Sequence, residues 1–220
     1  MSFNLPSDAK QIFPEDQSRT SREIYFYSTL GKKIYPLDPY YCIADIQLWD
    51  IATSLSLSYK FCGMTRRPYT MAEHSICLAA LIRRNCPDPE QARLALLSAS
   101  DVMGFGQRSI LHFNTPAELA LERMTWIEAV WGKFASPILA DTDLLQQAKS
   151  VILMAERLEL LQIEDPEDNF YPDPANEQLN KQVATVRIMM EEGRSQNFWR
   201  QRFLSLYADL TSEIENAHKK

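Results

Sequence analysis

A small set of side chains in the first third of the chain could contact a phosphate or a metal. His74 offers an imidazole, the commonest metal ligand among side chains, and it follows the acid Glu73. Arg66 and Arg67 come a few residues earlier, and their guanidinium forks suit phosphate geometry, with a salt bridge as the alternative role. The chain has only 3 His and no C-x-x-C pair, so it offers little material for a metal centre rich in His or Cys.

Three short segments carry a family resemblance. They are Asp50-Ile51-Ala52, the run YKFCGMTRR that ends at Arg67, and the run YTMAEHS that contains His74. Together they resemble the opening segment of the HD-domain metal-dependent phosphohydrolases. The resemblance is strongest to the branch common in phages, prophages and proteobacteria, which includes 5'-nucleotidase-like members. It implies a helical HD fold and a divalent metal held by a first His, a later His-Asp dyad and a final Asp.

Only one of those four ligand positions is retained in this chain. His74 stands at the first His. The run ALLSAS lies where the family reads roughly A-L-L-H-D-A, which puts Ser98 and Ala99 at the dyad. The later run QAKSVILMAERLEL matches the family pattern E-A-D-x-x-L-L-A-T-E-x-x-D-L and puts Lys149 at the final Asp, where an ammonium opposes metal entry. The resemblance thus implies degenerate metal-site positions at His74, Ser98, Ala99 and Lys149, with no metal and no cofactor.

Other positions that serve catalysis in the family also differ here. Val102 stands where active members carry a Glu that assists acid/base chemistry, and Gly106-Gln107 replaces a Gly-Asp pair. Thr53 and Met64 stand where the family often shows His. A working hydrolase would need every one of these losses to be bypassed, so the resemblance predicts a pseudoenzyme without catalytic residues.

Several of these residues are candidates for contacting a ligand in the former active-site pocket: Arg66, Arg67, His74, Asp101 and Gln107. For His74 the alternative is an inherited residue that is hydrogen-bonded inside a helical core. Asp101 comes one helical turn after Ser98, so we expect the two to face the same way. We also expect Lys149 to pair with Asp101 or Glu73 and so to cross-brace the helices where the metal once lay.

The sequence leaves open whether the pocket still exists. The apolar side chains of Met64, Val102 and Met103 could fill it, which would favour a contact with another protein over a small ligand.

The elements that must position these residues are mostly helical. Tyr- and Ile-rich residues 24–37 surround a Leu30-Gly31-Lys32-Lys33 turn and indicate a short hairpin. A capping box at Thr70 to Glu73 and an Asp88-Pro89 start are typical of helix N-termini. The expected helices span residues 45–55, 70–84, 88–103, 115–134, 143–161, 176–192 and 195–217.

These patterns predict an all-α protein with one domain. We expect an HD-like helical bundle over residues 23–217 with a short N-terminal hairpin or extended arm, preceded by a polar arm of residues 1–22.

Composition and charge argue against two kinds of binding partner, a nucleic acid duplex and a membrane. The 220 residues carry a net charge of −6 without a basic face, which argues against binding of a nucleic acid duplex. No apolar run approaches the roughly 18 residues of a membrane span, so no membrane partner is expected. The N-terminus lacks the pattern of a secretory signal, and the 4 Cys are therefore interpreted as reduced thiols of a cytoplasmic protein.

Three hypotheses for function follow. The first is a degenerate HD-domain protein that binds a nucleotide or another phosphorylated small molecule, or else a protein partner. The second is a divergent nucleotide phosphohydrolase whose site is rebuilt around His74, Asp101 and Glu73. The third is a structural homodimer that pairs through the aromatic face of Trp126 and Trp131, for which core packing is the simpler interpretation.

Overall fold

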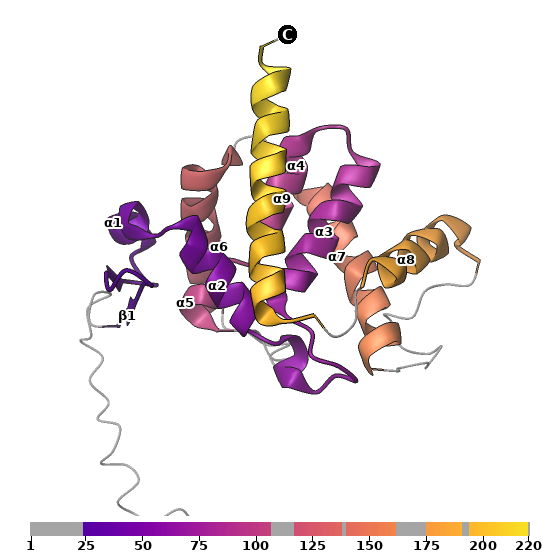
Figure 1. Ribbon diagram of the computed structural model, residues 1–220, viewed down its shortest axis with the longest axis horizontal. Helices are drawn as coiled ribbons and strands as arrows, with labels where there is room; N and C mark the ends of the chain where they lie inside the picture. Colours follow the sequence, from indigo (N-terminus) through magenta and orange to yellow (C-terminus); the bar gives the residue numbers. More distant parts are fainter. Residues whose placement is uncertain (1–23, 107–116, 138–139, 162–174, 191–193, 220) are drawn as a thin grey trace, which may run out of the picture.

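The computed structural model describes residues 24–106, 117–137, 140–161, 175–190 and 194–219. This part of the chain is all-α apart from one short hairpin, which confirms the predicted fold class (Figure 1). The predicted arm of residues 1–22 and Gln107 lie outside the described residues.

The hairpin lies where the turn signal predicted it. Strand β1 (Phe26–Tyr27) pairs antiparallel with β2 (Lys33–Ile34), and Phe26 is opposite Ile34. Gly31 has a φ of 73°, a left-handed conformation that glycine adopts without strain. The buried carboxylate of Asp50 accepts a hydrogen bond of 2.8 Å from the Thr29 backbone N–H, which ties the hairpin to the helical body.

The helical elements follow in chain order. They are α1 (Pro39–Cys42), η2 (Ile43–Asp45), α2 (Leu48–Leu57), η3 (Lys60–Gly63), α3 (Met71–Asn85), α4 (Pro89–Leu97), α5 (Val102–Phe105), α6 (Ala117–Phe134), α7 (Thr142–Glu156), η5 (Arg157–Leu161), α8 (Glu177–Met189) and α9 (Gln196–Ala217). Polar side chains cap the longer helices as the sequence suggested. The Thr70 oxygen accepts from the Glu73 N–H, and the Asp88 carboxylate accepts from the Glu90 N–H.

One predicted helix is wrong in its extent. The segment 88–103 forms α4 only as far as Leu97, then turns and resumes as the short α5. Backbone hydrogen bonds between residues three apart, such as Ser100 N to Leu97 O, tighten the chain through this turn. The indole N–H of Trp126 donates to the Ser100 carbonyl at 3.0 Å. In a continuous α-helix this carbonyl would accept from the backbone N–H four residues later.

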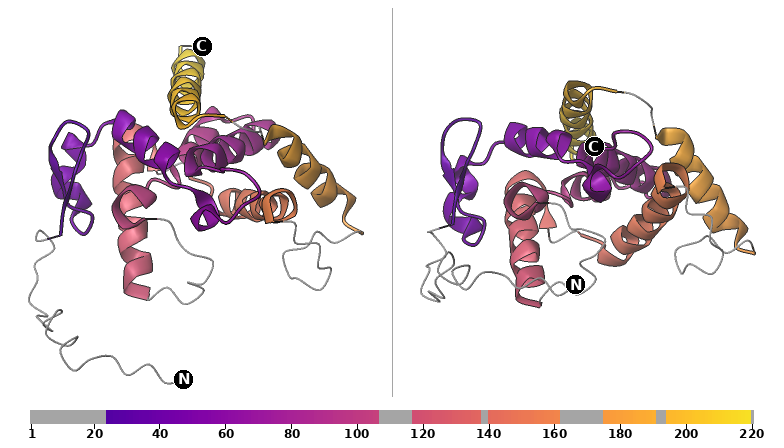
Figure 2. Two further views of the ribbon diagram at one scale, coloured as in Figure 1. Left: turned by 60° about the horizontal axis from the view of Figure 1, so that its bottom comes forward. Right: turned by 90° about the horizontal axis from the view of Figure 1, so that it is seen from below.

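Helix α3 lies at the centre of three layers. It packs against α4, α7 and α9, and the side chains of most of its length are buried. Figure 2 shows α9 on one side of α3 and α4, with α6 and α7 on the other side. Trp126 and Trp131 of α6 are 0% and 5% exposed, so they belong to the core of one chain. The homodimer face predicted at these two residues is therefore wrong.

Within the described residues, no helix combines the length and apolar character needed to cross a membrane.

A candidate ligand-binding pocket

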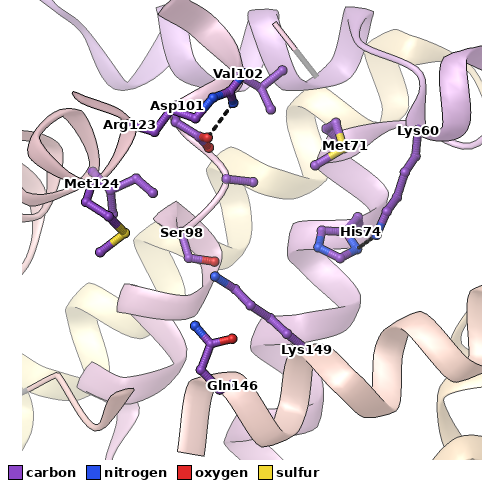
Figure 3. Close-up of a pocket in the computed structure, with 12 residues that line it drawn as sticks. Lys60, Met71, His74, Ser98, Asp101, Val102, Arg123, Met124, Gln146 and Lys149 are labelled. Atoms are coloured by element: carbon purple, nitrogen blue, oxygen red, sulfur yellow. Dashed lines mark hydrogen bonds and ion pairs between the residues drawn. The ribbon is translucent and has the colours of Figure 1, made fainter. Parts of the chain in front are cut away.

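A pocket of about 280 Å³ lies between α3, α5, α6 and α7. Four helices, the turn of residues 98–101 and the side chain of Lys60 form its walls, and Figure 3 shows the labelled side chains converging on one space. The lining residues are Lys60, Met71, His74, Ser98, Ala99, Asp101, Val102, Arg123, Met124, Ile127, Gln146 and Lys149. The four positions predicted to be a degenerate metal site, His74, Ser98, Ala99 and Lys149, therefore meet in this pocket.

The local sequence explains how these residues are brought together. His74 sits in the first turn of α3, which begins at the Thr70 cap. Ser98 ends α4, so the tight turn after Leu97 directs Ser98 and Asp101 toward α6 and α7. Lys149 lies midway along α7, whose start is fixed by the Asp141 cap.

A buried three-residue contact closes one end of the pocket, and we call it the brace. The Lys60 ammonium lies 2.5 Å from Glu156 Oε2 and 3.0 Å from His74 Nδ1. His74 Nδ1 lies 2.6 Å from Glu156 Oε1. Because Glu156 comes from α7 and His74 from α3, the brace joins two helices through a protein cation.

Protonation in the brace follows from burial and charge. Burial alone would raise the pKa of Glu156, but the Lys60 charge and His74 hold it at about 2, so the carboxylate is ionised. Burial and the neighbouring Lys60 lower the pKa of His74, with a smaller contribution from Lys149. Because an ionised carboxylate can only accept, we assign a neutral His74 whose Nδ1–H donates to Glu156. Lys60 then donates to Glu156 and not to His74, and Nε2 is left as an acceptor facing the pocket (Figure 3).

Glu156 was not among the predicted site residues, although it lies seven residues after Lys149 in the same run. Two helical turns separate the two positions, which places them on similar faces of α7. The seven-residue spacing from Lys149 could therefore have indicated Glu156 as a site residue.

A second buried ion pair lies in the opposite wall. Arg123 Nη1 is 2.8 Å from Asp101 Oδ2, and both side chains are less than 10% exposed. The same guanidinium also donates to the carbonyls of Phe105 and Gly106, so Nη1 and Nη2 each make two contacts. Arg123 was not predicted, because no motif marks a single arginine inside an amphipathic helix.

The acids proposed as partners of Lys149 contact arginines. Asp101 pairs with Arg123, and Glu73 accepts hydrogen bonds of 3.1 and 2.6 Å from Arg67. A contact between α3 and α7 is made by the three residues of the brace.

The two candidate arginines do not line the pocket. Arg67 forms the bidentate pair with the fully buried Glu73, which matches the salt-bridge alternative. Arg66 is exposed, and its backbone N–H donates to the Leu160 carbonyl. The prediction that they contact an anion in the pocket is therefore wrong. The backbone is left-handed from Phe61 to Gly63 and bends just after, which directs both side chains away from the pocket.

The other end of the pocket, which we call the polar end, is formed by Ser98, Gln146 and Lys149. Ser98 is 5% exposed, and its hydroxyl has no hydrogen-bond partner among the described residues. Figure 3 shows the Lys149 ammonium and the Ser98 hydroxyl pointing toward one another, with the Gln146 amide beside them. A buried hydroxyl without a partner costs free energy, which a polar ligand would recover.

The pocket is open despite the apolar residues that were expected to fill it. Met64 is 81% exposed and lies outside the lining, as does Met103, while Val102 contributes to one wall.

Charge in the pocket opposes a metal and favours an anion. Three cationic side chains line it, and two of them are paired with the carboxylates of Glu156 and Asp101, which leaves an excess of one positive charge. Among the described residues, no group of three or more His, Cys, Asp and Glu side chains could hold a metal ion.

No protein-family model matches the chain, and no curated protein matches it either. The resemblance to HD phosphohydrolases therefore rests on the sequence motifs alone.

Proposed function

We propose that this is a cytoplasmic, degenerate HD-domain protein that binds a small phosphorylated ligand without hydrolysing it. The observation that carries the proposal is the unpaired, buried Ser98 hydroxyl opposite the Lys149 ammonium in a cationic pocket. Hydroxyl and ammonium donors are what an oxyanion requires.

The HD relationship is supported by where the motif positions lie. His74, Ser98, Ala99 and Lys149 were matched to metal-ligand positions from three separate stretches of sequence, and all four line one pocket. If the sequence matches were accidental, there would be no reason for the four residues to line the same pocket.

The positive charge of the pocket and its small number of metal-coordinating side chains both speak against hydrolysis. An HD-type mechanism needs a metal-bound hydroxide, and the metal must compete with the ammonium groups of Lys60 and Lys149. His74 Nδ1 is already committed to Glu156, which leaves one imidazole nitrogen for any cation. In place of metal-assisted chemistry, the pocket offers donors for a phosphoryl group and an acceptor at His74 Nε2.

Calorimetric titration of the full chain with inorganic phosphate and with nucleoside monophosphates tests the proposal. We expect binding that Lys149→Met weakens at least tenfold, because the substitution removes a charge from the polar end but retains the length of the side chain. Lys181→Met is the matched control, since Lys181 is 82% exposed outside this pocket and its loss leaves binding unchanged. Absence of phosphate binding, or equal binding by Lys149→Met, would contradict the proposal.

The rebuilt hydrolase is tested in parallel. Chelator-stripped protein is titrated with Mn²⁺ and Co²⁺, with His74→Gln as the comparison. We expect no micromolar binding and no release of phosphate from nucleoside monophosphates. Micromolar binding that His74→Gln removes, together with phosphate release, would restore the hydrolase hypothesis.

A further inference from the structure

The pocket has one apolar wall in addition to its polar end. This wall is formed by Met71, Val102, Met124 and Ile127, which come from α3, α5 and α6. Figure 3 shows Met71, Val102 and Met124 on the side of the pocket opposite Lys149 and Gln146, with the Asp101–Arg123 ion pair between Val102 and Met124. A ligand that fills the pocket must therefore present an anionic group to one side and an apolar surface to the other.

The cations of the pocket are not equivalent in how they face a ligand. Arg123 contacts Asp101 and two backbone carbonyls, and Lys60 contacts Glu156 and His74. Lys149 points to the Ser98 hydroxyl, the one lining oxygen of the described residues that is buried without a hydrogen-bond partner. The anionic group is thus directed to the polar end, away from the two ion pairs.

The cavity also limits the size of the ligand. Sites for drug-sized molecules begin at roughly 300 Å³, and this cavity holds about 280 Å³. That space suits a phosphoryl group with one ring or a short apolar chain, whereas a nucleotide adds a sugar and a base to its phosphate.

We propose that the ligand class is a phosphomonoester of a single small apolar group, with the phosphate at Ser98 and Lys149 and the apolar group against Val102, Met124 and Ile127. This inference rests on the proposed function, because it requires phosphate binding in the same pocket. It adds that the wall selects the organic part of the ligand and that a small apolar group is preferred to the sugar and base of a nucleotide.

The experiment compares four probes by calorimetric titration: inorganic phosphate, glycerol phosphate, phenyl phosphate and adenosine monophosphate. We expect phenyl phosphate to bind at least tenfold more tightly than glycerol phosphate, since only the phenyl ring buries apolar surface against the wall. Adenosine monophosphate is expected to bind more weakly than phenyl phosphate.

Met124→Gln tests the wall with little risk to folding, because Met124 is 43% exposed and glutamine has a similar size and shape. We expect this variant to reduce the preference for phenyl phosphate at least threefold and to leave the affinity for inorganic phosphate unchanged. Met64→Gln is the matched control, because Met64 is 81% exposed outside the pocket, and it should behave as the original protein does.

The outcomes separate the two proposals. Equal binding of phenyl and glycerol phosphate, with Lys149 still required, overturns the inference and leaves phosphate binding intact. Tighter binding of adenosine monophosphate than of phenyl phosphate overturns the size limit. Absence of binding by all four probes overturns the proposed function itself.

Discussion

The brace and the polar end lie in the same pocket, yet their polar groups are paired in different ways. In the brace, Lys60, His74 and Glu156 contact one another at 2.5 to 3.0 Å. At the polar end, the buried Ser98 hydroxyl has no partner among the described residues. Buried charges that pair with one another hold a fold together, whereas a buried hydroxyl that has no partner and also lines a pocket can be contacted by a ligand. On the proposed function, the first region therefore serves stability and the second contacts the ligand.

The largest expected effect is on the brace. Lys60→Met should lower the free energy of unfolding by about 3–5 kcal/mol, because it leaves the fully buried Glu156 carboxylate without its cation. Urea denaturation monitored by circular dichroism measures this. Lys149→Met, the equivalent change at the polar end, should cost less than about 1 kcal/mol because Lys149 is only partly buried. Similar losses for the two variants would remove the distinction between the regions.

Acidification should weaken the brace selectively. The pKa of Glu156 is about 2 in the folded protein against a usual value of 4.5, so its stabilising contribution is present above pH 4.5 and is lost as the pH falls toward 2. The lowered pKa of His74 acts in the same direction below pH 6.5. The slope for one proton is at most about 1.4 kcal/mol per pH unit.

Comparison with Glu156→Gln isolates this contribution from that of other carboxylates. We expect the original protein to be more stable than the variant at pH 7, and the difference to shrink as the pH falls from 4.5 toward 2. Urea denaturation at several pH values measures both curves. A difference that does not change with pH would mean that the carboxylate is not ionised in the folded protein.

The smallest expected effect on stability is at Ser98, and it has the opposite sign. Ser98→Ala removes a buried hydroxyl that has no partner, so the free energy of unfolding should stay equal or rise by up to about 1 kcal/mol. Affinity for inorganic phosphate should fall at least threefold in the same variant. Thermal denaturation and calorimetric titration provide the two measurements.

Ser100 supplies a matched control for this prediction. Its hydroxyl is likewise buried without a partner among the described residues, but Ser100 does not line the pocket. Ser100→Ala should therefore have the same effect on stability as Ser98→Ala and no effect on binding. A loss of affinity in both variants would indicate an indirect effect of the turn after α4.

Much of the fold could be predicted from local signals. The hairpin, the helix caps at Thr70 and Asp88 and the starts of the later helices follow from residue types that act within a few positions of themselves. The break between α4 and α5 could not be predicted in this way. Trp126, 26 residues from Ser100 along the chain, donates to the Ser100 carbonyl within this turn, and no local signal specifies such a contact between distant segments.

In the candidate site, too, some features follow from local sequence and others depend on contacts between distant segments. The sequence by itself predicted that His74, Ser98, Ala99 and Lys149 belong to one site. Each lies within a short run of residues that resembles a motif of the HD phosphohydrolases. It misassigned Arg66 and Arg67, whose direction depends on a left-handed turn, and it left Lys60, Arg123 and Glu156 without a role. Only the tertiary structure decided which acid meets which base, because ion pairing depends on distances between helices that no local pattern specifies.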